Sequence, residues 1–236
     1  MEIGKKQTKG QKGFTIVELL IATTVFSTVL LVVTTGIIRI GQIYYKNLTQ
    51  NRTQEAARTV SSDITSAIQL ASGQILVVNY DPGNNKGIYC VGNTRYTYQL
   101  NRVYDASAGL TTSNFGLVAE NKPPSDPCNQ EFDPDTAKAM LGNNMRLLDF
   151  SICGEPSCGN SDLTGKTWQV KIKVAYGIND LLTHYSEDGT APQGWGGANN
   201  SEAGVKDATC RTGILGSSFC ATSQLDTLVK RRLNVE

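Results

Sequence analysis

Histidine is nearly absent from this chain of 236 residues, which contains only His184. A Ser-His-Asp or Cys-His site needs a histidine beside its nucleophile, and one histidine in a loop-like stretch is poor support for either. Structural zinc sites combine cysteine and histidine at short spacings, and no C-x-x-C pair occurs. We therefore expect a protein that is not an enzyme and that uses no metal and no cofactor.

An excess of charge of one sign is also lacking. The chain has 22 Lys and Arg against 21 Asp and Glu, a formal net charge of +1. This balance gives no sign of a bulk attraction to nucleic acid. The short basic run at residues 230–232 is more typical of an ordinary surface than of a DNA-binding site. DNA or a surface ligand stays a possible partner without support from the sequence. Proline is infrequent at 7 residues and glycine is frequent at 23, which favours a loop-rich β domain over disorder.

One long stretch, residues 19–38, has no ionisable side chain and is long enough to cross a bilayer as a helix. Lys5, Lys6, Lys9 and Lys12 precede it, so we expect the N-terminus in the cytoplasm and the C-terminus outside. Glu18 directly precedes this stretch, where placing a charge in the membrane costs a free energy of about 2–3 kcal/mol. A carboxylate in such a place indicates a function and requires a partner. The alternative is an ordinary membrane anchor whose first turn carries a snorkelling glutamate.

The segment Gly13-Phe14-Thr15-Ile16-Val17-Glu18, after its lysine-rich leader, resembles the class III signal of type IV pilins and type II secretion pseudopilins. The resemblance implies that a prepilin peptidase cuts between Gly13 and Phe14 and methylates the new terminus. It also implies an assembly site made of Phe14, Thr15 and Glu18, in which Glu18 neutralises the terminal amine of a neighbouring subunit. The implied partners are the peptidase, other pilin or pseudopilin subunits, a pilus or secretion assembly platform, and membrane lipid before assembly.

We divide the chain into a cleaved leader (1–13), a transmembrane and assembly helix (14–40), an amphipathic continuation of that helix (41–72) and an exported β-rich domain (73–236). In the continuation, Val60, Ile64, Ala67, Ile68 and Ala71 recur at steps of three and four residues. This spacing predicts one apolar helix face, which we expect to pack on a sheet.

Beyond residue 72 the pattern changes to short β-type runs separated by turn-rich loops. The clearest run alternates Trp168, Val170, Ile172 and Val174 with polar residues. We predict strands at 75–80, 87–91, 95–104, 146–153 and 168–176, and a strand or extended tail at 225–235. We also predict a brief helix at 136–141 and a long loop at 179–206. The predicted fold class is therefore α+β, with a long N-terminal helix packed on an antiparallel β-sheet domain that has disulfide-linked loops.

All six cysteines follow the apolar segment: Cys90, Cys128, Cys153, Cys158, Cys210 and Cys220. An even count in the part that would be exported predicts a disulfide framework. Six cysteines allow fifteen pairings. Proximity in the sequence favours Cys153 with Cys158 and Cys210 with Cys220, which leaves Cys90 with Cys128.

These observations predict a structural subunit of a type IV pilus-like filament, either a minor pilin or a large pseudopilin. It would reside in the cytoplasmic membrane as a single-pass protein and lie at the pilus or cell surface after assembly. The alternative is a membrane-anchored adhesin, or a sugar- or DNA-binding module, that uses residues 179–206 and the loop between Cys210 and Cys220 for recognition.

Overall fold

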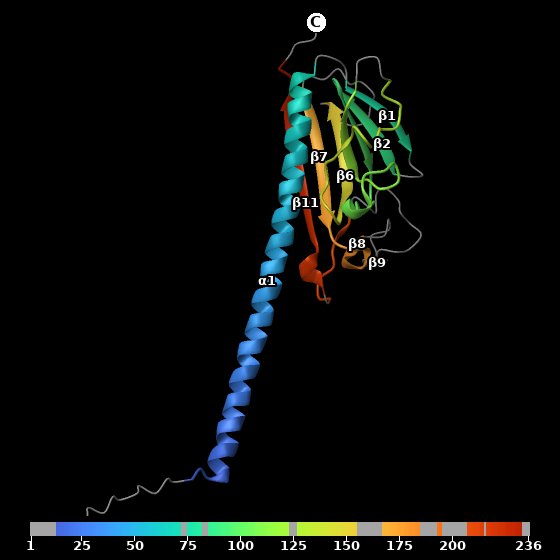
Figure 1. Cartoon of the computed structure of the whole chain (residues 1–236). Helices are drawn as coiled ribbons and strands as arrows, with labels where there is room; N and C mark the ends of the chain where they lie inside the picture. The colour runs from blue at the N-terminus through green and yellow to red at the C-terminus, as the bar shows by residue number, and fades with distance from the viewer. Residues whose placement is uncertain are drawn as a thin grey trace, which may run out of the picture. The chain divides into compact units, whose positions relative to one another are not determined.

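The computed structural model describes residues 13–71, 75–81, 85–122, 127–154, 167–184, 193–194, 207–214 and 216–232 (Figure 1). It divides into two compact units, Met1–Tyr44 and Tyr45–Glu236, and each unit is described here by itself. Most of the predicted leader, residues 1–12, lies outside the described residues. The predicted boundaries after residues 13, 40 and 72 stay predictions.

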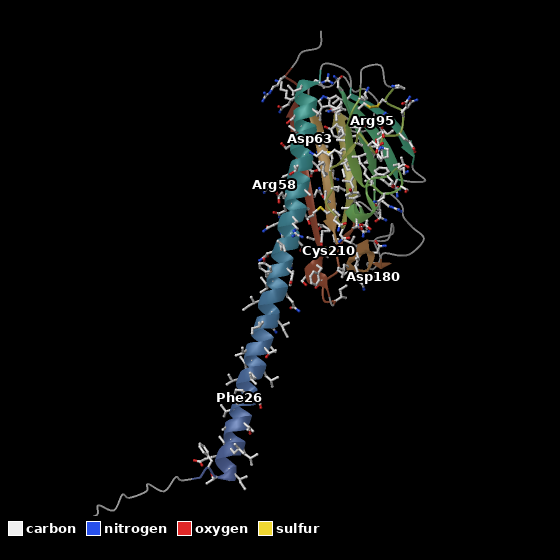
Figure 2. The ribbon with its side chains drawn as sticks, in the orientation of Figure 1. Phe26, Arg58, Asp63, Arg95, Asp180 and Cys210 are labelled. Atoms are coloured by element: carbon white, nitrogen blue, oxygen red, sulfur yellow. A yellow bond between two sulfur atoms is a disulfide. The ribbon has the colours of Figure 1, made fainter. Side chains whose placement is uncertain are left out.

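In the first unit, the described chain is almost entirely helix α1 (Ile16–Leu70), which runs through Thr35 and Gly36 without interruption. Its hydroxyl side chains bond to carbonyls of the same helix; for example, Thr24 Oγ1 donates to Ile21 O at 2.8 Å. These bonds satisfy the hydroxyl groups inside the helix, which is what an apolar environment requires. The large apolar side chains point outward, and Phe26 is 64% exposed (Figure 2).

In the second unit, α1 buries one face, and the predicted apolar face is confirmed. Val60, Ile64, Ile68 and Ala71 are buried, and Ala67 is partly buried against the same core. Their spacing of three and four residues keeps them on one side of a helix with 3.6 residues per turn. This part of the helix therefore forms one wall of the hydrophobic core.

In the described part of the second unit, three antiparallel sheets accompany the helix, so the predicted α+β class is confirmed. A five-stranded sheet has the order β1-β2-β3-β4-β5, and two three-stranded sheets have the orders β11-β7-β6 and β10-β8-β9. The first sheet contains β1 (Ile75–Asp81), β2 (Lys86–Val91), β3 (Thr94–Gln99), β4 (Leu117–Asn121) and β5 (Lys138–Ala139). The others contain β6 (Met145–Gly154), β7 (Thr167–Tyr176), β8 (Leu182–His184), β9 (Gln193–Gly194), β10 (Thr209–Cys210) and β11 (Ala221–Lys230). Single-turn 3-10 helices are η1 (Ala106–Ala108), η2 (Asn179–Leu181) and η3 (Ser217–Phe219).

The core lies between α1 and the inner faces of two sheets, the five-stranded sheet and β11-β7-β6. Figure 1 shows α1 running alongside β11 and β7. Alternate residues of β7 are fully buried, as the sequence predicted from the run that contains Trp168. Tyr89 and Tyr98 meet the edge of the Phe150 ring from the neighbouring sheet, with centroids 5.3 and 5.1 Å away. These aromatic contacts join the two sheets into one core.

A buried tyrosine ties the helix to the five-stranded sheet. The hydroxyl of Tyr96 on β3 donates to Asp63 Oδ2 on α1 at 3.0 Å. Burial raises the pKa of Tyr96 far above its usual range, and the nearby Asp63 charge raises it further. The hydroxyl therefore stays protonated and keeps its role as a donor.

Four predicted elements are wrong at their ends or in kind. The loop predicted at 179–206 contains η2, β8 and β9, because β8 pairs with β10 and β9. The strand predicted at 95–104 ends at Gln99, because Asn101 adopts a left-handed φ of 63° and donates its N–H to Leu147 O on β6. The helix predicted at 136–141 is instead strand β5, where Ala139 pairs with Val118. The last strand begins at Ala221 rather than 225, because it pairs with β7 along its whole length. Each error reflects a contact with a distant part of the chain.

The disulfide pairs Cys90–Cys128 and Cys210–Cys220 are confirmed, with Cα–Cα distances of 6.1 and 5.7 Å. Cys153 is also disulfide-bonded. Its predicted partner, Cys158, lies outside the described residues, so that pairing stays a prediction.

Candidate processing and assembly site

The predicted cleavage point lies just before α1, in backbone that is not helical. Gly13, Phe14 and Thr15 precede the first helical residue, Ile16. Phe14 is 85% exposed, and a methyl group added at Gly13 would meet no atom within 4 Å. The bond between Gly13 and Phe14 is therefore open to an enzyme, and no described residue lies close enough to require glycine at position 13.

Thr15 and Glu18 form a reciprocal capping box at the start of the helix. The N–H and the hydroxyl of Thr15 both donate to Glu18 Oε2, at 3.1 and 3.0 Å. In return the N–H of Glu18 donates to Thr15 Oγ1 at 3.2 Å. The bonds satisfy two N–H groups that a helix start otherwise leaves without partners.

This second role of Glu18 was missed by our sequence analysis, which assigned the carboxylate only to contacts between subunits. The signal was present, because Thr15-x-x-Glu18 has the spacing of a capping box. The geometry makes Thr15 a positioning residue, since its two bonds hold the carboxylate at the helix start beside Phe14. A negative charge there is also favoured by the positive end of the helix dipole.

Helix α1 is long and apolar enough to cross a membrane. Its most apolar stretch is not buried at all within the structure. The helix of a soluble protein core passes the same length test but is mostly buried, which is not the case here. The site thus joins an exposed bond at the predicted cleavage point, a capped carboxylate and an apolar helix.

The family comparison points to the same residues. Residues 8–34 match the prokaryotic N-terminal methylation motif. The chain fits a type IV pilin-like prepilin. Neither the curated proteins nor the solved structures include a match to this chain. The pilin-type motif implies, in general terms, membrane anchoring, a prepilin peptidase and assembly with other pilin subunits.

Other kinds of site have less support. Within the described residues, no group of three or more His, Cys, Asp or Glu side chains is placed to hold a metal ion. The expectation that this pilin-like precursor uses no metal or cofactor, and is not an enzyme, stays a prediction.

Proposed function

We propose that this protein is a non-enzymatic structural subunit, a minor pilin or a large pseudopilin, of a type IV pilus-like filament. It is inserted in the cytoplasmic membrane with its N-terminus inside, cut between Gly13 and Phe14, and methylated on the Phe14 amine. The observation that carries this proposal is the coincidence of the methylation motif at residues 8–34 with the unburied apolar stretch of α1. The size of the second unit and its long loops favour a minor pilin or large pseudopilin over a major pilin.

The exposed apolar side chains of α1 explain why the subunit needs two environments. Val25, Leu31 and Ile37 are each more than half exposed. Exposing such a surface to water is unfavourable by a free energy of about 25 cal/mol for each Å² of apolar area. Lipid covers it before assembly and the helices of other subunits cover it afterwards, so that extraction from the membrane need not expose it to water.

Glu18 has the capacity for a second partner in the filament. Its two hydrogen bonds from Thr15 both end on Oε2. A carboxylate has about four lone-pair sites, so the group can also accept from an ammonium. We assign that ammonium to the Phe14 terminus of a neighbouring subunit. The capping box then holds the carboxylate in place before the neighbour arrives.

The decisive experiment separates the charge of Glu18 from its capping role. Glutamine can replace glutamate in a capping box, whereas valine cannot. Loss of a hydrogen bond to a charged group costs about 1.5–3 kcal/mol, so we expect Glu18→Gln to lower incorporation into filaments roughly 10- to 100-fold. Incorporation is measured by mass spectrometry of sheared filaments, relative to the dominant subunit and to the amount of mature protein in the membrane.

Two controls make the result specific. Thr15→Val removes the hydroxyl of the capping box but keeps the carboxylate, and we expect a smaller loss than for Glu18→Gln. The mature peptide should begin at Phe14 with one extra methyl group in every variant, because Gly13 and Phe14, which form the predicted cleavage point, are unchanged. Normal incorporation of Glu18→Gln, with failure only of Glu18→Val, would show that helix capping rather than charge pairing is the role of Glu18.

The second candidate function is a membrane-anchored ligand-binding module. Of the loops predicted to carry recognition, residues 185–192 and 195–206 lie outside the described residues. The observation that favours ligand binding is a pocket on the five-stranded sheet. A filament subunit could have such a pocket as well.

A further inference from the structure

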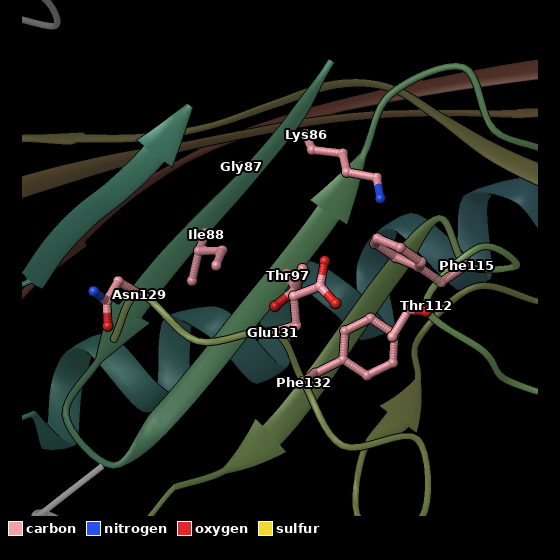
Figure 3. A pocket seen from close by; sticks show the side chains of 9 residues that line it. All are labelled: Lys86, Gly87, Ile88, Thr97, Thr112, Phe115, Asn129, Glu131 and Phe132. Carbon is pink, nitrogen blue, oxygen red and sulfur yellow. The ribbon is translucent and has the colours of Figure 1, made fainter. Parts of the chain in front are cut away.

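A pocket of about 190 Å³ lies on the outer face of the five-stranded sheet (Figure 3). Tyr96 and Tyr98 of β3 point into the main core, so Thr97 between them faces the opposite side. There it pairs across the strands with Ile88 of β2. Figure 3 shows these two residues on the strands, next to the segment that carries Glu131 and Phe132. The lining residues are Lys86, Gly87, Ile88, Thr97, Thr112, Phe115, Asn129, Glu131 and Phe132.

The sheet side of this pocket contains a polar atom with an unmet hydrogen bond. Thr97 is 7% exposed, and its Oγ1 has no hydrogen-bond partner within the described part of the chain. A buried hydroxyl without a partner is unfavourable, and most such groups in proteins are paired. The oxygen itself is almost fully covered, so a ligand hydroxyl would supply the partner once rotation about the Thr97 Cα–Cβ bond turns Oγ1 toward the pocket.

The other side chains around the pocket combine apolar contact with balanced charge. Phe115 and Phe132 meet edge to face with centroids 4.9 Å apart, and together with Ile88 they supply the apolar part of the lining. The ammonium of Lys86 lies 5.4 Å from the centre of the Phe115 ring. Glu131 and Asn129 are exposed on the overlying segment. One positive and one negative charge leave the lining without a net charge.

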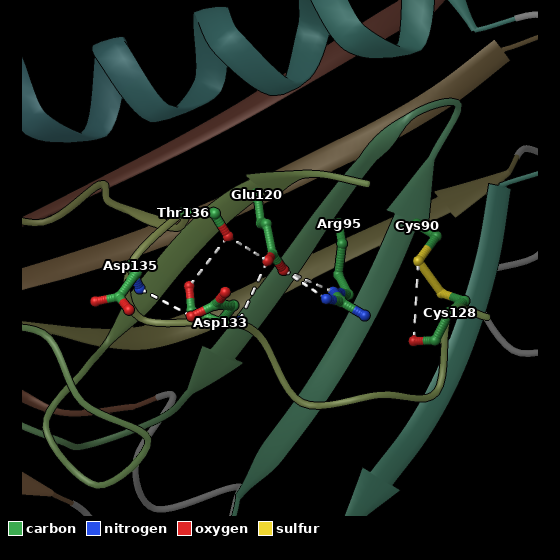
Figure 4. A network of polar contacts seen from close by, with 7 residues as sticks. All are labelled: Cys90, Arg95, Glu120, Cys128, Asp133, Asp135 and Thr136. Carbon is green, nitrogen blue, oxygen red and sulfur yellow. Dashed lines mark hydrogen bonds and ion pairs between the residues drawn. A yellow bond between two sulfur atoms is a disulfide. The ribbon is translucent and has the colours of Figure 1, made fainter. Parts of the chain in front are cut away.

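The segment over the pocket is held in place at two points, shown in Figure 4. At one end the disulfide Cys90–Cys128 fastens it to β2. Farther along, Glu120 Oε1 on β4 accepts from the N–H of Asp133 at 3.2 Å and from Thr136 Oγ1 at 2.8 Å. Asn129, Glu131 and Phe132 lie between these points. The site is therefore formed before a ligand arrives, which lowers the entropy cost of binding.

We propose that this pocket binds a single pyranose ring. Ring C–H groups would pack on the Phe132 and Ile88 side, and ring hydroxyls would bond to Glu131, Lys86 and Thr97. A polyhydroxylated ring both donates and accepts, which matches a carboxylate acceptor, an ammonium donor and a hydroxyl that does either. An apolar lining with a few convergent polar groups is typical of small-molecule sites.

Other ligand classes fit the pocket less well. A phosphate backbone is disfavoured, because the lining offers Lys86 alone and Glu131 opposes it. An extended peptide would add to a free strand edge, but β2 and β3 are paired on both sides. An organic cation would compete with Lys86, which already lies over the Phe115 ring. The inference does not depend on the proposed filament function.

The test is saturation-transfer NMR on the mature full chain in phosphocholine micelles, since glycoside detergents would compete for the site. The probes are D-glucose, D-galactose, D-mannose and N-acetyl-D-glucosamine at about 10 mM, suited to millimolar affinity. We expect saturation of the ring protons of at least one probe. The absence of transfer to all four would overturn the proposal.

Variants locate the site. Thr97→Val keeps the shape but removes the hydroxyl, and we expect binding about fivefold weaker, the effect of one neutral hydrogen bond. Its unfolding midpoint should equal or exceed that of the wild type, because the lost hydroxyl has no partner among the residues that the structure describes. Glu131→Gln should also weaken binding. The matched control is Glu55→Gln, an exposed glutamate on α1 outside the pocket. Equal binding by Thr97→Val, Glu131→Gln and the wild type would place the sugar elsewhere and overturn the proposal.

Discussion

Glu120 offers the sharpest stability test, because it joins a buried ion pair to the segment over the sheet (Figure 4). Glu120 and Arg95 are 7% and 3% exposed. Arg95 Nε donates to Glu120 Oε2 at 3.1 Å, and a second guanidinium nitrogen donates to the same oxygen. Glu120→Gln keeps the shape and an acceptor for Asp133 and Thr136 but removes the negative charge. Arg95 would then be a buried cation without its carboxylate.

Glu120→Gln should lower the free energy of unfolding by a large amount for such a small change in the side chain. Removing one member of a buried ion pair costs about 3–5 kcal/mol, because the other charge remains in a low-dielectric site. Glutamine retains two of the bonds, so we expect the lower end, about 3 kcal/mol. Replacing both residues removes the buried guanidinium together with the carboxylate. Arg95→Met combined with Glu120→Gln should therefore be more stable than the sum of the single changes by about 1–3 kcal/mol.

The pH dependence gives an independent check on the same residue. Burial raises the pKa of Glu120. Hydrogen bonds from Arg95, Thr136 and the Asp133 N–H, together with the Arg95 charge, lower this pKa by more than burial raises it. The net pKa lies below the usual glutamate range, so folding is stabilised above the unfolded pKa of about 4.3. This stability is lost as the pH falls through the lower, folded pKa. Glu120→Gln should remove that part of the acid destabilisation.

The assay is urea unfolding of the mature chain, followed by tryptophan fluorescence and near-ultraviolet circular dichroism. Trp168 is fully buried on β7 and reports on the core of the second unit. The reasoning that this pair is buried and interdependent would be refuted by two results together. Glu120→Gln would lower the free energy of unfolding by less than about 1 kcal/mol, and its effect would be additive with that of Arg95→Met.

Two further predictions concern the core and the disulfides. Ile64→Ala removes a fully buried side chain from the helix face and should cost about 2–5 kcal/mol, whereas Ile43→Ala, at a 61% exposed position, should leave urea unfolding of the second unit unchanged. Replacing both cysteines of a pair by serine should cost about 4 kcal/mol for Cys90–Cys128 and about 3 kcal/mol for Cys210–Cys220, because the loops span sequence separations of 38 and 10. The same urea assay checks both, and a larger loss for the shorter loop would contradict the chain-entropy argument.

The sequence by itself determined the features that depend on neighbouring residues. The order of the basic leader, Gly13, Phe14, Glu18 and the apolar run is local, and the methylation motif matches the same stretch. The apolar face around Ile64 follows from helix periodicity, and the half-buried strand around Trp168 from alternation. Cys210–Cys220 was predictable because a short loop brings its ends together readily.

Only the tertiary structure decided how distant segments meet. Nothing in the local pattern shows that Arg95 and Glu120, on neighbouring strands 25 residues apart, share a buried bond. The same holds for Tyr96 with Asp63, and for the pocket that contains Thr97. Strand β5 formed where a helix was predicted, because pairing with β4 outweighed a weak local preference. Local propensities amount to fractions of a kcal/mol per residue, whereas burial and pairing amount to several kcal/mol, so long-range contacts decide wherever the two disagree.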